Sequence, residues 1–409
     1  MAAVEDKKKS KKRKNETPEE RAARKALKKQ KLLTPKPRSD SFSKPAQLPA
    51  PERADATTFA AFAKEHAVEL SGQEPVPVVD FAKSPFNAAC QQKLSKEGFA
   101  KPTPTQSVSW PLALTGTDLI SIAKTGSGKT LGFLLPAFHR VEQKFERNST
   151  SIAAPKIVVM APTRELALQI ASDASKFAPC FGGTTAVCYG GAPKWEQVKK
   201  LRFLNGRGCV VATPGRLNDL QNQGKIFLNE VDVLVLDEAD RMLDMGFEPQ
   251  IRQIVQQRGM PEPGDRQTML FSATFPKEIQ RMASDFLDDY IFITVGRVGS
   301  SHTNITQSVE YVQGYTDKCN MLLDLVHAVQ GLTLVFTETK RGADQLEDWL
   351  SQQGFPSTSI HGDRTQQERE WALKSFRSGN TPILVATDVA ARGLDIPHVT
   401  HVINFDLPS

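Results

Sequence analysis

The segment LISIAKTGSGKT, from Leu119 to Thr130, is followed by a stretch with helical spacing over residues 131–140. An apolar strand, a glycine-rich loop and a helix in this order are typical of a phosphate-binding loop. The glycines let backbone N–H groups turn towards phosphate oxygens, and the helix N-terminus adds partial positive charge. The general pattern has glycine where this chain has Ala123. A glycine turn without a ligand is the alternative, but the flanking strand and helix favour the phosphate loop.

This loop also carries the side chains that a nucleoside triphosphate requires. We expect the Lys129 ammonium to reach the β- and γ-phosphates of ATP and the Thr130 hydroxyl to bind Mg²⁺. The loop residues expected to contact the nucleotide are Ala123, Lys124, Thr125, Gly126, Ser127, Gly128, Lys129 and Thr130.

A second segment, VLVLDEAD at residues 233–240, ends an apolar strand in carboxylates. Such carboxylates lie at the C-terminal edge of an open α/β sheet, where these sheets bind ligands. Hydrolysis of ATP needs one carboxylate to hold Mg²⁺, which Asp237 suits, and another to orient and deprotonate the attacking water, which Glu238 suits. A solvated acidic turn is the alternative. Together with the phosphate loop, the segment predicts an ATP-hydrolysing site with Lys129, Asp237 and Glu238 as catalytic residues.

Most of the chain alternates short apolar runs with longer segments of helical spacing. The first series has apolar runs at 119–123, 156–161, 208–212, 231–236 and 268–271, with helical segments at 163–177 and 246–257. The second has apolar runs at 332–336, 357–360, 382–386 and 399–405, with helical segments at 318–329, 340–353 and 366–378. This alternation predicts two α/β domains with parallel sheets and crossover helices.

The domain boundaries follow from composition. We assign residues 1–70 to a basic tail and linker, 71–297 to the first domain and 298–409 to the second. Ordered structure is expected to start near residues 75–81. A flexible hinge is expected near residues 296–305, from Gly296, Gly299, Ser300 and Ser301.

The N-terminal tail differs from the rest of the chain in charge. Residues 1–44 hold 16 Lys and Arg against 6 Asp and Glu, whereas residues 45–409 hold 36 against 40. Nucleic-acid binding by the folded body therefore requires a local groove, while the tail supplies non-specific attraction. The run KKKSKKRK at residues 7–14 is a candidate nuclear or nucleolar targeting signal, compatible with a solvated, disordered charge run. Residues 18–33 predict a marginal basic helix, and 34–57 a linker.

Other compositional features exclude several classes of protein. No apolar run approaches the roughly 20 residues that span a bilayer, and the N-terminus lacks the apolar region of a secretory signal. The five cysteines are far apart without a C-x-x-C spacing. They are expected to be buried or idle thiols in a reducing compartment rather than metal ligands or disulfides.

The tetrad at residues 237–240 spells DEAD, and the chain resembles the DEAD-box RNA helicases. The segment GFAKPTPTQ at residues 98–106 resembles the Q motif of that family, although Thr105 stands where isoleucine is more usual. The resemblance implies that the Gln106 amide pairs with N6 and N7 of adenine, a geometry that proteins also use to read adenine in DNA. It further implies that Phe81 stacks on the base; packing in the core is the alternative for this ring.

Other segments of the first domain resemble the RNA-backbone elements of the family. These are PTRELA at 162–167, GG at 190–191 and TPGR at 213–216. Hydroxyls, helix N-termini and arginines suit phosphate and sugar contacts without base reading. The implied RNA contacts are Pro162, Thr163, Arg164, Gly191, Thr213, Pro214, Gly215 and Arg216. The triplet SAT at 272–274 resembles the motif that couples the ATP state to unwinding, which adds Ser272 and Thr274 to the catalytic group and Asp240 to the nucleotide contacts.

The second domain carries three matching segments: LVFTET at 334–339, HGDR at 361–364 and ATDVAARGLD at 386–395. The resemblance implies RNA contacts from Thr337, Arg364 and Thr387, and nucleotide contacts from Gly393 and Asp395. The histidines lack metal-ligand spacing, so we expect structural or solvent-facing roles for His361, His398 and His401.

The family carries one further motif, of the form HRxGRxxR, whose arginines reach the γ-phosphate. The sequence ends at Ser409 before this motif is reached. The expectation is therefore an incomplete second domain, and a polypeptide that binds ATP but hydrolyses it poorly.

The resemblance implies two tandem RecA-like domains, dependence on ATP and Mg²⁺, and a monomeric RNA helicase without a membrane anchor. Within the family, the chain is most similar to fungal nucleolar members that process pre-rRNA for the 60S ribosomal subunit, with pre-ribosomal proteins as partners. This similarity is carried by the Lys-rich tail, by Ser71-Gly72 followed by Pro75-Val76-Pro77, and by Trp110-Pro111-Leu112. An ATP-gated RNA clamp or assembly scaffold is the main alternative, and a DNA helicase is a third reading.

Overall fold

The computed structural model describes residues 56–144, 154–204, 206–296, 305–388, 396 and 398–407. Residues 1–55 of the predicted tail and linker, with the targeting run and the basic helix at 18–33, lie outside these residues, as do the hinge residues Gly299, Ser300 and Ser301. Residues 56–70, which were also assigned to the tail and linker, are described and are ordered. No helix in the described ranges is long and apolar enough to cross a membrane.

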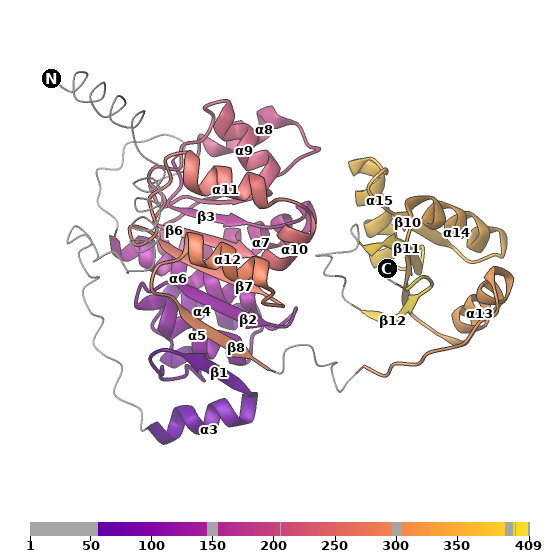
Figure 1. Cartoon of the computed structure of the whole chain (residues 1–409), viewed down its shortest axis with the longest axis horizontal. Helices are drawn as coiled ribbons and strands as arrows, with labels where there is room; N and C mark the ends of the chain where they lie inside the picture. Colours follow the sequence, from indigo (N-terminus) through magenta and orange to yellow (C-terminus); the bar gives the residue numbers. More distant parts are fainter. Residues whose placement is uncertain are drawn as a thin grey trace, which may run out of the picture. The chain divides into compact units, whose positions relative to one another are not determined.

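The described part of the first domain is built on an eight-stranded sheet of order β1-β8-β2-β7-β6-β3-β5-β4 (Figure 1). The strands are β1 (Val68–Ser71), β2 (Leu119–Ala123), β3 (Ile157–Met160), β4 (Thr185–Cys188), β5 (Cys209–Ala212), β6 (Val233–Asp237), β7 (Gln267–Ser272) and β8 (Ile291–Val295). All neighbours pair in parallel except β1, which is antiparallel to β8. The central strands are buried along their whole length, because helices cover both faces.

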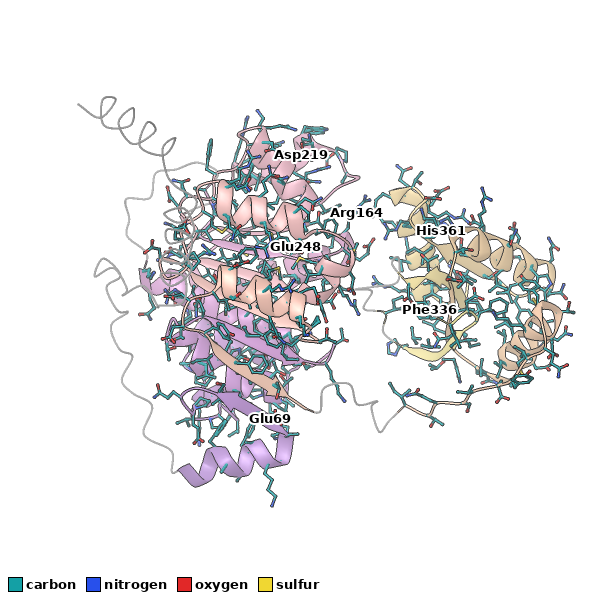
Figure 2. The ribbon with its side chains drawn as sticks, in the orientation of Figure 1. Glu69, Arg164, Asp219, Glu248, Phe336 and His361 are labelled. Carbon is teal, nitrogen blue, oxygen red and sulfur yellow. The ribbon has the colours of Figure 1, made fainter. Side chains whose placement is uncertain are left out.

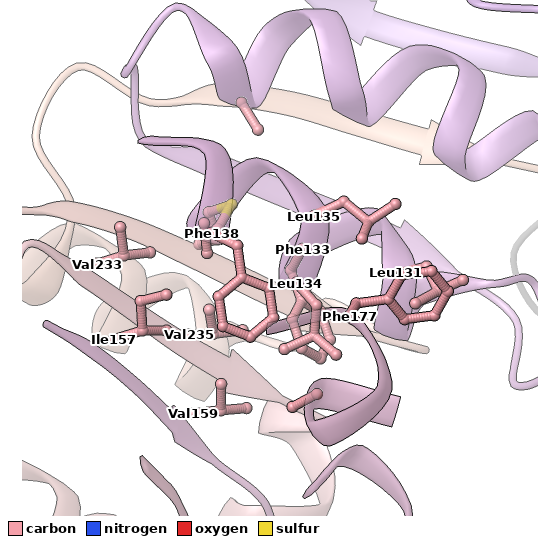
Figure 3. Close-up of a cluster of buried hydrophobic side chains, with 14 of the residues drawn as sticks. Leu131, Phe133, Leu134, Leu135, Phe138, Ile157, Val159, Phe177, Val233 and Val235 are labelled. Carbon is pink, nitrogen blue, oxygen red and sulfur yellow. The ribbon is translucent and has the colours of Figure 1, made fainter. Parts of the chain in front are cut away.

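Two hydrophobic layers hold these helices on the sheet. On one face lie α4 (Ala88–Lys96), α5 (Pro104–Leu114), α6 (Lys129–Lys144) and α7 (Arg164–Phe177). On the other lie α8 (Lys194–Leu201), α9 (Pro214–Asn222), α10 (Ala239–Asp244), α11 (Glu248–Gln257) and α12 (Lys277–Phe286). Successive strand residues alternate between the layers, so Ile157 and Val159 pack with Phe138 of α6, whereas Val158 joins the opposite layer (Figure 3).

The second domain repeats this arrangement on a smaller scale. In its described part a four-stranded sheet has the order β10-β11-β9-β12, all parallel. The strands are β9 (Leu332–Thr337), β10 (Ser357–Ile360), β11 (Ile383–Thr387) and β12 (Val399–Asn404). The helices α13 (Tyr315–Ala328) and α14 (Lys340–Gln352) cover one face, and α15 (Gln366–Arg377) covers the other.

The predicted architecture of two α/β domains with parallel sheets is confirmed. The expectation that order starts near residue 75 is wrong, because α3 (Ala56–His66) and β1 precede it. The ring of Phe59 on α3 is buried in the first hydrophobic layer, and β1 closes the sheet beside β8. This packing, which the polar sequence around β1 does not reveal, orders the segment.

Candidate functional site

The strand order places the two predicted ATP-binding segments on one edge of the first sheet. The phosphate loop follows β2, and the acidic tetrad begins at the end of β6. Between these strands lies β7, which ends in Ser272, and β2, β7 and β6 are parallel neighbours. Their C-terminal ends therefore lie side by side, at the edge where open α/β sheets bind ligands.

The phosphate loop has a backbone that requires glycine. Gly126 and Gly128 have φ angles of 76° and 81°, in the left-handed region. A Cβ atom on Gly128 would lie 2.6 Å from Nε2 of Gln106 and 2.7 Å from Oγ1 of Thr103. At the start of α6, the Lys129 side chain is buried and its Nζ donates to the Ala123 carbonyl oxygen at 3.0 Å. The Lys129 side chain therefore folds back over the phosphate loop.

The segment before α5 supports the loop from outside. Thr103 caps α5 in a capping box with Gln106, and its Oγ1 donates to the Ser127 carbonyl oxygen at 2.8 Å. The Gln106 amide donates from Nε2 to the Gly128 carbonyl oxygen at 3.0 Å and accepts at Oε1 from the Thr103 N–H at 3.1 Å. Each end of this amide makes one bond to the protein and keeps one further N–H and one further lone pair, so the predicted pairing with adenine stays a prediction.

Phe81 is the other residue predicted to contact the base. Its side chain is buried within the first hydrophobic layer, and its ring centroid lies 6.1 Å from that of Trp110. The structure therefore places Phe81 in the core, which is the alternative left open by the sequence. The reason is tertiary: Trp110 lies on the buried face of α5 and anchors itself by donating to the Leu131 carbonyl oxygen at 3.0 Å.

The acidic pair is buried. Removal from water raises the pKa of Asp237 to about 7, although the charge of Lys129 opposes this rise. Burial also raises the pKa of Glu238, against the Arg241 guanidinium, whose Nη1 lies 3.0 Å from Oε2 of Glu238. Both carboxyl groups therefore hold a proton more readily than exposed ones.

Arg241 was missed by the sequence analysis. It lies three residues after Glu238, a spacing that places two side chains on the same face of a helix, so the signal was available.

The last residue of the tetrad connects two strand ends. Oδ2 of Asp240 accepts from the Thr274 backbone N–H at 3.0 Å and from its hydroxyl at 2.8 Å. The Asp240 N–H in turn donates to the Ser272 hydroxyl at 3.3 Å, and its Oδ1 accepts from the Arg241 N–H at 3.0 Å. Asp240 was expected among the nucleotide contacts. Its carboxylate bonds to Thr274, after β7, and to Arg241 of α10, because β6 and β7 are neighbours; the nucleotide contact stays a prediction.

The predicted RNA-backbone residues of the first domain follow the next three strands of the same edge. β3, β5 and β4 end before the PTRELA, TPGR and GG segments. Arg164 begins α7 (Figure 2), and the Thr163 hydroxyl caps that helix by accepting from the Leu166 N–H at 3.3 Å. A single pocket is lined by residues of all three segments, among them Pro162, Thr163, Arg164, Gly190, Thr213, Gly215 and Arg216.

The GG segment packs on two arginines. Gly191 has a φ of 78°, and a Cβ there would lie 2.2 Å from Nη1 of Arg164. The Arg216 guanidinium donates to the Ala192 carbonyl oxygen at 3.2 Å from Nη2. Pro214 is buried at the start of α9, and no side-chain bond caps this helix from Thr213. The structure thus brings these predicted residues together.

In the second domain, Thr337 ends β9 and Thr387 ends the neighbouring β11, and both are buried. Arg364, expected to contact RNA, instead donates to acidic groups of α14. Its Nη2 lies 2.9 Å from Oδ1 of Asp344 and 2.6 Å from Oε2 of Glu347. All of these bonds come from Nη2, so the phosphate contact predicted for Arg364 stays a prediction. Gly393 and Asp395 lie outside the described residues.

The histidine of the HGDR segment has a structural position. His361 is buried after β10 (Figure 2), and its Nε2 lies 2.8 Å from the same Asp344 oxygen. Within the described residues, no three His, Cys, Asp or Glu side chains are grouped as a metal site would require.

Comparison with known proteins places this geometry in a family. Residues 103–282 match the family model of DEAD/DEAH box helicases, and residues 317–409 match the helicase conserved C-terminal domain. A DEAD-box ATP-dependent RNA helicase 52A from Oryza sativa subsp. japonica is 52% identical over 364 residues, which are 83% of this chain and 60% of the rice protein. The chain thus spans about three fifths of the length of that relative.

Two solved structures are similar over most of the chain. The RNA helicase Prp28 from Chaetomium thermophilum, bound to ADP, is 32% identical with a TM-score of 0.54, over 89% of this chain and 85% of that one. The yeast DEAD-box splicing factor Prp28 is 29% identical with a TM-score of 0.54, over 87% and 82%. The comparisons and the motifs at the edge of the first sheet point to the same family. The chain therefore belongs to the DEAD-box RNA helicase family.

Proposed function

We propose that this protein is an ATP-dependent RNA helicase that remodels RNA duplexes or ribonucleoprotein complexes. One observation carries the proposal. The phosphate loop, Ser272 and the acidic pair follow three adjacent strands, and the RNA-backbone segments follow the next three strands of the same edge. The residues proposed to act on ATP lie at one half of this edge, and those proposed to contact the RNA backbone lie at the other half. A single sheet connects the two sites.

The nucleotide half is proposed to bind ATP through the loop amides and Lys129. The Thr130 hydroxyl and the Asp237 carboxylate are hard oxygen donors of the kind that Mg²⁺ prefers, so these residues fit a magnesium–nucleotide complex. Bound Mg²⁺ would neutralise charge on the β- and γ-phosphates. The raised pKa of Asp237 falls when a cation is present, because the cation favours the carboxylate form.

Glu238 is proposed as the general base. Its buried carboxylate accepts a proton from the attacking water as the water adds to the γ-phosphorus, while the bond from this phosphorus to the bridging oxygen breaks and ADP leaves. The raised pKa of Glu238 favours this transfer, since a more basic carboxylate takes up the proton more readily. Arg241 holds one oxygen of the group at 3.0 Å and so fixes its direction.

The RNA half is proposed to contact phosphates and sugars without reading bases. Arg164, Arg216 and the N-termini of α7 and α9 offer donors and positive charge for a phosphate backbone. ATP and RNA together favour closure of the two domains, which bends the strand and releases its partner. Asp240 is placed to relay the nucleotide state, since it joins the strand ends at Ser272 and Thr274.

The decisive experiment offers the protein equal RNA and DNA duplexes with ATP or a non-hydrolysable analogue. The proposal expects displacement of RNA strands that requires ATP and release of phosphate that RNA stimulates. ATP-dependent retention of RNA without strand displacement or repeated turnover would support the clamp instead. Equal displacement of DNA would contradict the choice of RNA, which rests on contacts to 2′-hydroxyl groups.

We further propose a nucleolar site of action, on pre-rRNA of the large ribosomal subunit and with pre-ribosomal proteins as partners. The basic run at residues 7–14 supports this proposal, because such runs act as nuclear or nucleolar signals. The protein is proposed to act as a monomer. Fluorescence microscopy tests the nucleolar site of action. The tagged full chain is compared with a variant in which the lysines of this run are replaced by glutamine. Identical distributions of the two proteins would contradict the role of the run.

A further inference from the structure

The loop that carries Gly190 and Gly191 leaves the open edge of the first sheet. β4 is the last strand of the sheet, and its Cys188 carbonyl oxygen accepts from the Thr213 N–H at 3.0 Å. Because consecutive residues of a strand point their backbone groups to opposite sides, the N–H and C=O of Tyr189 face outward, where no strand pairs with them. Tyr189 is partly buried, and a partner for its backbone groups stabilises the chain at this point.

Gln197, from α8, supplies both bonds. Its Oε1 accepts from the Tyr189 N–H at 3.1 Å, and its Nε2 donates to the Tyr189 carbonyl oxygen at 3.0 Å. The side chain is only 5% exposed. A primary amide has one donor and one acceptor side by side, which is the pairing that a neighbouring strand would offer. Gln197 therefore takes the place of a neighbouring strand at the point where the loop begins.

The two arginines proposed to bind RNA rest on the same loop. Arg164 fills the space beside Gly191 that any Cβ would occupy, and Arg216 donates to the carbonyl oxygen of Ala192. The Thr213 N–H is bonded to Cys188, the residue before Tyr189. A shift of the loop would therefore move both guanidinium groups and the start of α9 together.

We infer that Gln197 is the positioning residue of the RNA-binding half of the first domain, and that it sets RNA affinity without touching RNA or ATP. The inference rests on the proposed function. It assigns a role to a residue outside the PTRELA, GG and TPGR segments, through the two bonds that fix the loop between them.

Gln197→Glu in the full chain tests this role, because the change keeps the shape, removes the donor and, when the group is ionised, adds a negative charge. At about pH 7.5 the carboxylate faces the Tyr189 carbonyl oxygen, and we expect about tenfold weaker RNA binding, as for an acceptor that loses its donor. RNA affinity is measured by fluorescence anisotropy of a labelled single strand with a non-hydrolysable ATP analogue. The affinity for a fluorescent ATP analogue without RNA should stay within about twofold of the unaltered protein.

A pH series separates positioning from general damage. Burial raises the pKa of a carboxyl group, so the substituted side chain regains a proton at mildly acidic pH and can again donate to the Tyr189 carbonyl oxygen. We expect the RNA affinity of Gln197→Glu, taken relative to the unaltered protein at each pH, to recover at least partly at that pH. Gln197→Ala, which has no proton to regain, should show no recovery.

Gln267→Glu provides a matched control. The Gln267 amide is also buried and donates from Nε2 to the carbonyl oxygens of Ala113 at 2.7 Å and Thr117 at 2.9 Å, away from the RNA segments. This variant should lose thermal stability but retain RNA affinity. The inference would be overturned if Gln197→Glu bound RNA as tightly as the unaltered protein, or if Gln267→Glu lost as much RNA affinity as Gln197→Glu. Either result would leave the proposed function standing. An unaltered protein that retained no RNA with the ATP analogue would overturn the proposed function, and the inference with it.

Discussion

At the scale of single residues, the acidic pair owes its chemistry to burial and to an unusual backbone. Glu238 has a φ of 51° and a ψ of 52°, a left-handed conformation that costs an L-residue about 1–2 kcal/mol. The strain is tolerated because Glu238 is held on both sides, by the buried β6 and by Arg241. The conformation turns the chain sharply from β6 into α10, so that Asp237 and Glu238 both remain at the sheet edge.

Glu238→Gln should preserve ATP binding and abolish turnover. The amide keeps the size of the side chain but accepts no proton, so we expect phosphate release to fall by at least about 100-fold. A phosphate-release assay measures turnover, and a fluorescent ATP analogue measures binding. Asp244→Asn, at the end of the same helix, is the control. Normal turnover of Glu238→Gln would show that the water is activated elsewhere.

Lys129→Ala should weaken nucleotide affinity itself. The buried ammonium is a positive charge that the loop offers to the phosphates, and charge-assisted bonds are the stronger ones, so an affinity loss of at least about tenfold is expected. Isothermal titration with ADP and with an ATP analogue provides the measurement. Lys176→Ala, an exposed lysine on α7, serves as the control. Unchanged affinity in Lys129→Ala would remove the lysine from the phosphate site.

At the scale of elements, single hydrogen bonds join helices and strands that are distant in sequence. The cap of α5 reaches the phosphate loop from Thr103 to Ser127, and α10 reaches the end of β7 from Asp240 to Thr274. Each bond links a helix to a loop, so the helix holds the loop in position. The nucleotide site therefore depends on α5 as much as on its own glycines.

Thr103→Val is expected to loosen the phosphate loop. Valine has nearly the shape of threonine but lacks the hydroxyl that donates to Ser127 and caps α5. We expect the KM for ATP to rise about five- to tenfold, consistent with the loss of one or two hydrogen bonds, while RNA affinity stays constant. Thr115→Val is the matched control, since it removes a hydroxyl bond at the other end of the same helix. Equal effects of the two substitutions would indicate general destabilisation of α5.

At the scale of the whole molecule, stability and affinity depend on where charge is held. The first domain buries Asp237, the proposed magnesium ligand, and burial of the ionised carboxylate costs stability in the nucleotide-free protein. The tail, by contrast, concentrates 16 Lys and Arg in 44 residues, while the remaining 365 residues are slightly acidic. We therefore expect the sheet edge to carry the ATP and RNA sites, and the tail to add non-specific attraction to RNA.

Asp237→Asn should raise the thermal midpoint of the nucleotide-free protein, and more so at high pH. Burial raises the pKa of Asp237 from 3.8 to about 7, so between these values the folded state binds a proton that the unfolded state has released. The free energy of unfolding therefore falls as pH rises through this window. Thermal denaturation at several pH values should show a gap between variant and unaltered protein that widens towards pH 8. A gap that is constant or narrows would contradict the raised pKa.

Deletion of residues 1–44 should weaken RNA binding and flatten its dependence on salt. The deleted segment has a net charge of +10, from 16 basic and 6 acidic residues, and counterion release makes such binding steeply salt-dependent. The maximal rate of ATP hydrolysis at saturating RNA should not change, because the sheet edge is intact. Anisotropy titrations over a range of salt concentrations measure the slope, and an unchanged slope would assign the electrostatic attraction to the folded body.

Much of the fold could be predicted because most strands are buried on both faces and therefore appear as apolar runs. The predicted runs match β2, β3, β5, β6, β7 and the four strands of the second sheet to within a few residues. β1 and β4 were missed because they are short edge strands with alternating burial. β8, which reads IFITV, carries the apolar signal but was not assigned.

The sequence by itself determined which chemistry this protein carries, because the phosphate loop, the acidic tetrad and the RNA segments are local strings whose residue types and order state their roles. Only the tertiary structure decided which polar atoms meet. Gln106 bonds to Gly128, Arg364 to Asp344, and Gln197 to Tyr189, and none of these pairs is signalled by spacing along the chain. The physical reason is that a buried donor or acceptor must find a partner, and strand order and helix packing decide which partner lies within reach.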